Sequence, residues 1–227
     1  MPDTHRQDQD PEVTLITPTA PIATPTHGGR AKCLQRLVRL DLPVPRTVAL
    51  SFDTVHRIAK GAMPDIRAIL DEYPAGALLC VRPSSEDPDW GGPGSVLNIG
   101  MNDALFVEFS DSIGPTAASA LYKRFVTAYA IHVARLDPDV FEEIDAPGQE
   151  GLSEVLRCYE EEAEEPFPQD PAVQLAEVLR SMARAWEGTT ARLLRQAKGA
   201  PMDAGLGLIV QEMALGVGDG ECGYRRP

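Results

Sequence analysis

The stretch Ala77 to Asp103 reads ALLCVRPSSEDPDWGGPGSVLNIGMND, and the rest of the chain is organised around it. Its first residues, 77–81, form a short apolar run whose length suits a buried strand better than a helix. Arg82 follows, then two serines, an acidic patch and a glycine-rich loop, before a second apolar run begins at Val96. This order indicates a phosphate-binding segment, because glycines let backbone N–H groups approach an anion and arginine supplies a planar charged fork. The alternative is a Pro/Gly surface hairpin with one solvated arginine.

A second candidate anion site lies at residues 27–30, which read HGGR and precede a helical pattern. Apolar residues recur over 30–41 at the spacing of an amphipathic helix. Arg30 and Lys32 would lie in its first turn, where basic residues oppose the helix dipole, so their presence there favours an anion-binding role. The alternative is an ordinary helix that begins after the two glycines and whose basic residues point to water.

Composition limits the class of protein. The chain has 227 residues, of which 43% are hydrophobic and 24% charged, as in ordinary soluble globular domains. The net charge of −13 argues against non-specific nucleic-acid binding but leaves a nucleotide site open. No apolar run is long enough for a transmembrane helix, and no signal peptide is recognisable. The four cysteines are scattered without a CxxC pair, so we expect no metal site, and a reduced, cytoplasmic setting.

The remaining segments alternate between strand and helix patterns. Residues 1–26 are polar and then rich in Pro, Thr and Ala, which predicts a disordered or extended segment with a short strand at 13–16. The acidic run Glu160 to Glu165 is expected to be a solvated helix end. Further strands are predicted over 47–52 and 208–215, and helices over 53–60, 63–73, 115–136 and 170–195, the last broken at Gly188. This pattern predicts an α+β (α/β) fold.

In seven collinear places, from about residue 27 to about 220, the chain resembles the pyruvate, phosphate dikinase family and the related phosphoenolpyruvate synthases. The first place spans residues 28–45, whose ends, 28–31 and 42–45, resemble the family's GGKGxNLxxM and GLPVPxGF. Residues 80–84 and 96–103 resemble SVRSGA and TILNLGLND. Residues 121–125, 167–175 and 209–213 are similar to SYRRFI, FPQEPxxQL and VNVQxM, and Trp186 matches the tryptophan of RSW.

The resemblance implies that residues 27–227 form an ATP-grasp-type N-terminal module, a mixed sheet with flanking helices and an incomplete second half. In that family ATP phosphorylates a histidine on a swivelling domain, and the phosphohistidine then serves pyruvate and phosphoenolpyruvate. The implied cofactors are ATP and Mg²⁺, with metal ligands that would lie beyond residue 227. The implied partners are a phosphohistidine domain and a pyruvate/phosphoenolpyruvate domain, on another chain or in a missing continuation; neither nucleic acid nor membrane is implied.

The resemblance also assigns site residues one by one. Arg30 lies where the family has its phosphate-binding lysine, and Arg82, the one catalytic residue expected, lies on its nucleotide-phosphate arginine. Ser84 is implied as a secondary phosphate contact, and Gly91 is the glycine kept in register with the family's SMPGMMD loop. The segment lining the adenine site would be Gln211, Glu212, Met213 and Ala214.

The departures from the family pattern define a second hypothesis. Arg30 replaces a lysine, and a guanidinium fork grips phosphate differently from an ammonium. None of the four histidines lies in a matching phosphohistidine motif, so we do not expect the chain alone to complete the dikinase reaction. The alternative is a non-catalytic or regulatory binding module derived from an ATP-grasp fold, without phosphotransferase activity.

Overall fold

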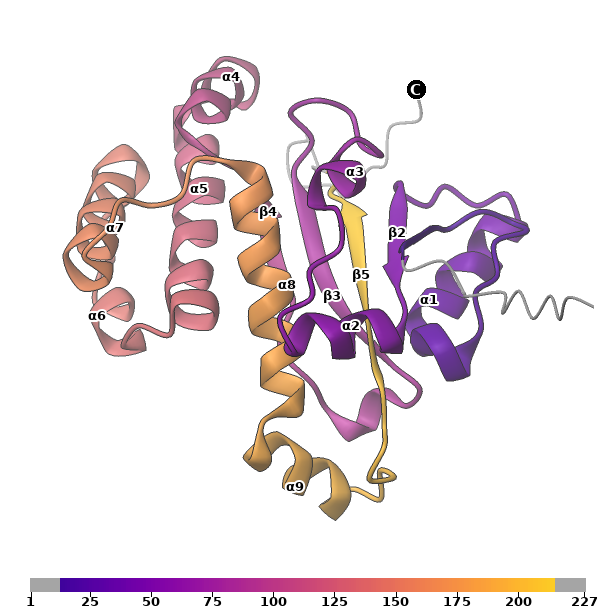
Figure 1. Ribbon diagram of the computed structural model, residues 1–227. Coiled ribbons are helices and arrows are strands. Elements are labelled where there is room, and N and C mark those ends of the chain that lie inside the picture. The colour runs from indigo at the N-terminus through magenta and orange to yellow at the C-terminus, as the bar shows by residue number, and fades with distance from the viewer. Residues whose placement is uncertain (1–12, 215–227) are drawn as a thin grey trace, which may run out of the picture.

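The structure is a computed structural model of the chain, in which residues 13–214 are described (Figure 1). It confirms the α+β class, with one five-stranded sheet in the order β1-β2-β5-β3-β4 and helices around it. The strands are β1 (Val13–Leu15), β2 (Thr47–Leu50), β3 (Leu79–Ser85), β4 (Val96–Ile99) and β5 (Leu206–Glu212).

The sheet is antiparallel at each described pairing, so the expected mixed sheet is wrong. The reason lies in the position of β5. Because β5 runs antiparallel to both β2 and β3, these two strands are parallel to each other, as their helical crossover allows. The last strand inserts between them and replaces the parallel pairing with two antiparallel ones.

Helix α1 (Thr24–Arg39) covers one face of the sheet, which we call the α1 face. A small core of Ile22, Ala31, Ala49 and Ile209 forms there together with its neighbours. The helix begins six residues before the expected start at residue 30, and Gly28 interrupts it with φ 83° and ψ 169°. The resulting kink brings the first turn of α1 against β3.

The opposite face carries the main core, under α2 (Phe52–Ala59), α3 (Ile66–Leu70) and α8 (Pro171–Glu187). Figure 1 shows α2 and α8 in front of the strands. The helix expected over 63–73 shrinks to α3, because Asp65 caps its start and Pro74 follows its end. The predicted break at Gly188 is confirmed, with α9 (Thr189–Ala197) beyond it.

A helical layer flanks the β4 edge. It contains α4 (Asp103–Ile113), α5 (Pro115–Tyr129) with a π-helical turn (Ala130–Ala134), α6 (Pro138–Glu142) and α7 (Gly148–Ala163). Its core is aromatic: the Phe167 ring lies 5.3–5.9 Å from the rings of Tyr122, Phe125, Tyr129 and Tyr159. Residues 160–162 at the end of α7 are exposed, as are residues 164 and 165 just beyond it, which agrees with the predicted solvated helix end.

Candidate functional site

Strand β3 places Arg82 on the α1 face. Cys80 lies opposite Gln211 in the ladder, and because side chains alternate along a strand, Arg82 points to the same side as both. The Arg82 Nη1 donates to Gln211 Oε1 at 3.3 Å, and Gln211 Nε2 donates to Thr47 Oγ1 at 2.9 Å. A polar row across three strands therefore holds the Arg82 guanidinium in position.

Arg30 reaches the same face from the first turns of α1. Its Nη1 donates to the Pro83 carbonyl at 2.6 Å. Ser84 joins helix and strand at the neighbouring position: its hydroxyl donates to the His27 carbonyl at 2.7 Å and accepts from the Ala31 N–H at 3.1 Å. Ser84 is 1% exposed. Its hydroxyl thus holds the start of α1 against β3, and its contact with a phosphate stays a prediction.

The two arginines form a positively charged pair. Burial lowers the pKa of Arg30, and the nearby charge of Arg82 lowers it further. Neither guanidinium has a carboxylate within ion-pair distance among residues 13–214. In a chain whose net charge is −13, two adjacent cations without a carboxylate partner in the described part of the chain favour an anion, so this face is the candidate anion site.

A cavity of about 570 Å³ lies between the start of α1 and the loop after β3. Gly29, Arg30 and Cys33 form one wall, and residues 83–85, Pro88 and the glycine loop, Gly91 to Pro93, form the other. Asp87 caps the short 3-10 turn Pro88–Trp90 that leads into this loop, and Gly91 has a φ of 82°, which favours glycine. The structure thus brings together the two glycine segments that the sequence singled out.

The remaining site residues of the prediction lie outside this cavity. Arg82 is beside it on the sheet face, joined to Gln211. Glu212 and Met213 continue β5 through backbone bonds to Arg46 and Leu78, and the Met213 sulfur accepts from the Asn98 N–H at 3.1 Å. Ala214 ends the described chain and is exposed. The adenine contacts of residues 211–214 stay a prediction.

Three residues near the glycine loop were not singled out as site residues from the sequence. A Cβ added to Gly92 would lie 3.6 Å from the Trp186 ring, and one added to Gly91 would lie 3.5 Å from Lys198 Nζ. The Arg195 guanidinium stacks on the same ring at 3.6 Å. These residues lie about a hundred positions after the loop, so local sequence patterns do not connect them with it.

Two further findings concern the described part of the chain. Residues 13–214 contain no group of three or more His, Cys, Asp or Glu side chains placed to hold a metal ion. Over the same residues, no helix combines the length and the apolar character that crossing a membrane requires.

Comparison with known proteins gives sequence relatives, whereas no protein-family model matches the chain. Pyruvate, phosphate dikinase of Rhizobium meliloti (strain 1021) is 31% identical over 225 residues, covering 83% of this chain and 25% of that protein. The enzyme of the same name from Clostridium symbiosum is 29% identical over 158 residues, covering 61% of this chain and 18% of its own length. That of Entamoeba histolytica is 24% identical over 200 residues, covering 72% of this chain and 23% of its own. The chain spans a quarter or less of the length of these relatives. Over that part its sequence is similar to pyruvate, phosphate dikinases, in agreement with its motifs.

Proposed function

We propose that the chain is the ATP-binding part of a pyruvate, phosphate dikinase-like phosphotransferase, built on an ATP-grasp-type module. The observation that carries the proposal is the pair Arg30 and Arg82, adjacent on one sheet face, beside a glycine-lined cavity and without carboxylate partners in the described chain. The motifs and the relatives named above agree with it.

In this proposal the two arginines share the phosphates. A guanidinium has five N–H donors, and the contact to Pro83 occupies one nitrogen of Arg30, which leaves the others to bind phosphate oxygens in the cavity. Arg82 acts as the catalytic cation by stabilising the charge that develops on the transferred phosphoryl group. The glycine loop offers backbone N–H groups, and residues 211–214 bind the adenine.

The proposal includes Mg²⁺, a phosphohistidine domain and the conversion of pyruvate to phosphoenolpyruvate, as the resemblance implies. The described carboxylates form no ligand cluster, so this chain's residues 13–214 do not fit a metal site by themselves. We therefore assign no step through the metal to these residues. Phosphoryl transfer requires the histidine acceptor on another chain or in a continuation of this one.

Calorimetric titration of the full chain with Mg-ATP tests the proposal. We expect Arg30→Gln and Arg82→Gln each to weaken binding by about 1.5–3 kcal/mol, the usual worth of a hydrogen bond to a charged group. Arg36→Gln is the matched control, because Arg36 is exposed on the same helix and outside the cavity. If both variants bind like the control, the site assignment is wrong.

A second candidate is a module that binds nucleotide without transferring phosphate. The observation that favours it is that the side chains of Arg30 and Ser84 both form hydrogen bonds that hold α1 to β3. If Mg-ATP binding depends on Arg30 and Arg82, yet the chain neither hydrolyses ATP nor transfers phosphate to an added dikinase phosphohistidine domain, this candidate is favoured over the first.

A further inference from the structure

The glycine loop, Gly91 to Pro93, separates two cavities. One is the cavity of about 570 Å³ that Arg30 lines. The other has about 470 Å³ and lies on the far side, where Trp186, Leu194, Arg195 and Lys198 complete its wall. Because the loop residues line both cavities, side chains from either cavity can contact a ligand that lies along the loop.

Helix α9 is anchored so that Lys198 stands over the loop. Arg195 is 5% exposed, stacks on the Trp186 ring and donates from Nη1 to the Trp186 carbonyl at 2.6 Å. Trp186 in turn packs next to Gly92. Lys198 is the C-cap residue that follows α9, and its Nζ lies 3.5 Å from the position that a Cβ on Gly91 would take. The ammonium therefore faces a stretch of loop backbone that carries no side chain.

The far wall is positively charged. Of the residues that line it, Arg195 and Lys198 are cationic and none is a carboxylate, whereas Arg192 lies outside this cavity and pairs with Glu187 at 3.1 Å. Lys198 is exposed, and within the described part of the chain it forms no ion pair or hydrogen bond through its side chain. The bare loop thus has Arg30 on one side and Lys198 on the other, and both charges are free to attract an anion.

We propose that Lys198 is a phosphate-binding residue that grips a linear polyphosphate, the tail of a nucleoside triphosphate, across the glycine loop from Arg30. This proposal rests on the proposed function and extends it. A single phosphate ion can contact one wall at a time, whereas a chain of phosphates lying along the loop contacts both. An ammonium is a mobile point charge on a flexible stem, which suits the end of such a chain.

Titration of the full chain with inorganic tripolyphosphate tests the proposal, and tryptophan fluorescence is the readout. The chain has two tryptophans, Trp90 and Trp186, and both line the cavity beyond the loop. We expect Lys198→Gln to weaken tripolyphosphate binding about fivefold, equivalent to about 1 kcal/mol, and Lys198→Arg to retain it. Lys198→Gln and the unmodified chain should bind orthophosphate equally well. Added salt should reduce the difference between their affinities for tripolyphosphate.

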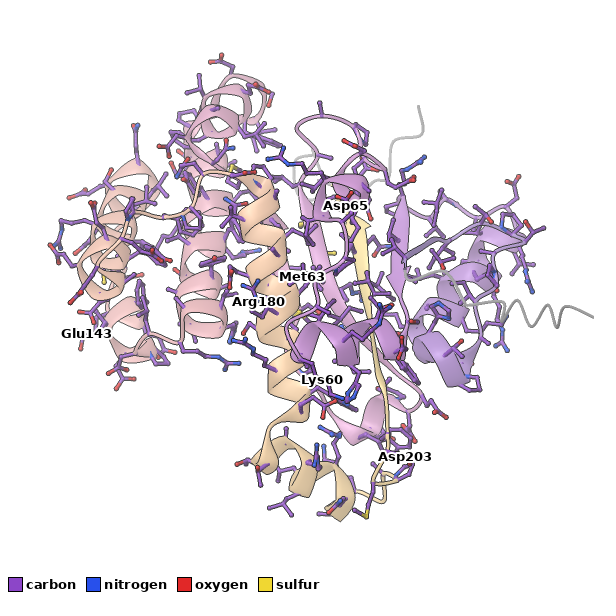
Figure 2. All side chains as sticks on the ribbon, viewed as in Figure 1. Lys60, Met63, Asp65, Glu143, Arg180 and Asp203 are labelled. Atoms are coloured by element: carbon purple, nitrogen blue, oxygen red, sulfur yellow. The ribbon has the colours of Figure 1, made fainter. Side chains whose placement is uncertain are left out.

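Lys60→Gln is the matched control, because it removes one positive charge from an exposed lysine that follows α2 (Figure 2). If Lys198→Gln binds tripolyphosphate like this control, or if the unmodified chain does not bind tripolyphosphate, the proposal is overturned. Binding of Mg-ATP that depends on Arg30 but not on Lys198 would leave the proposed function intact and refute this inference. If tripolyphosphate binding depends on Lys198 but the chain does not bind Mg-ATP, the inference that Lys198 binds a linear polyphosphate is supported and the nucleotide function is refuted.

Discussion

Replacing Gly28 with alanine should be among the most damaging single changes in the described chain. Gly28 lies inside α1 with φ 83° and ψ 169°, a backbone conformation that residues with a Cβ rarely adopt. An ideal Cβ there would lie 2.0 Å from the Ser84 carbonyl oxygen and 2.4 Å from its carbon. Both atoms are backbone of β3, and Ser84 is held in register opposite Gly207 of β5, so neither can yield without disturbing the sheet.

The magnitude follows from two contributions. A strained backbone conformation costs about 1–3 kcal/mol. Overpacking against a rigid neighbour costs about 1–3 kcal/mol more. Moving α1 away from β3 would also weaken the bonds of the Ser84 hydroxyl to His27 and Ala31. We therefore expect Gly28→Ala to lower the free energy of unfolding by about 2–6 kcal/mol, a large part of the 5–15 kcal/mol typical of a domain.

Guanidinium chloride unfolding followed by circular dichroism measures this loss. Gly94→Ala is the control, since a Cβ at Gly94 would have no atom within 4 Å and the residue has no positive φ. We expect the control to change the free energy of unfolding by no more than about 0.5 kcal/mol. If the free energies of unfolding of Gly28→Ala and Gly94→Ala differ by less than about 1 kcal/mol, the expected strain is absent. In that case α1 does not approach β3 as described.

Two other predictions concern the packed interior away from the candidate site. Gln174 is fully buried and bonds to three backbone groups: it accepts from the Gly100 N–H at 2.8 Å and donates to the carbonyls of Met101 and Pro168 at 3.0 and 2.7 Å. Gln174→Leu leaves these groups unpaired, so thermal unfolding should show that the free energy of unfolding falls by about 3–5 kcal/mol. A loss no larger than that of Gln196→Leu, at a partly exposed glutamine of α9, would refute the network. The second prediction is alkaline unfolding, because burial raises the pKa of the tyrosines that line the core, that of Tyr159 to about 12. Their folded pKa values exceed the unfolded value of about 10, so stability is complete below that pH and falls above it. Phenolate absorbance should therefore rise together with the loss of circular dichroism; free titration near pH 10 in the folded chain would contradict this for Tyr73, Tyr122, Tyr129 and Tyr159.

The strands at the centre of the sheet were predictable because they are buried on both faces. The apolar run 77–81 corresponds to the start of β3, and the run at 208–215 overlaps β5, whose residues Leu208, Ile209 and Val210 are fully buried. A continuous apolar run is the sequence sign of such a strand. The predicted start of this last strand, residue 208, lies two residues after Leu206, where β5 begins.

The position of β5 between β2 and β3 was not predictable from local patterns. Strand order depends on contacts between segments that are more than 120 residues apart, such as Cys80 with Gln211. The length of α1 was missed for a different reason. Glycines at 28 and 29 indicate a helix start, but Pro25 already begins a helical turn and Gly28 bends the helix without ending it.

The site shows why residue type alone leaves function open. Serine, glycine and arginine beside a strand are the residues that bind phosphate, and they are also the residues that can join a kinked helix to a strand. Here Gly28 and Ser84 make that joint, and the joint brings Arg30 over the glycine loop at Gly91. Ser84 can thus support an anion site without touching the anion, because its two hydrogen bonds fix the helix that carries the charge. The sequence singles out segments that meet in the structure, whereas only the contacts between them separate a residue that could bind an anion from one that positions a neighbour.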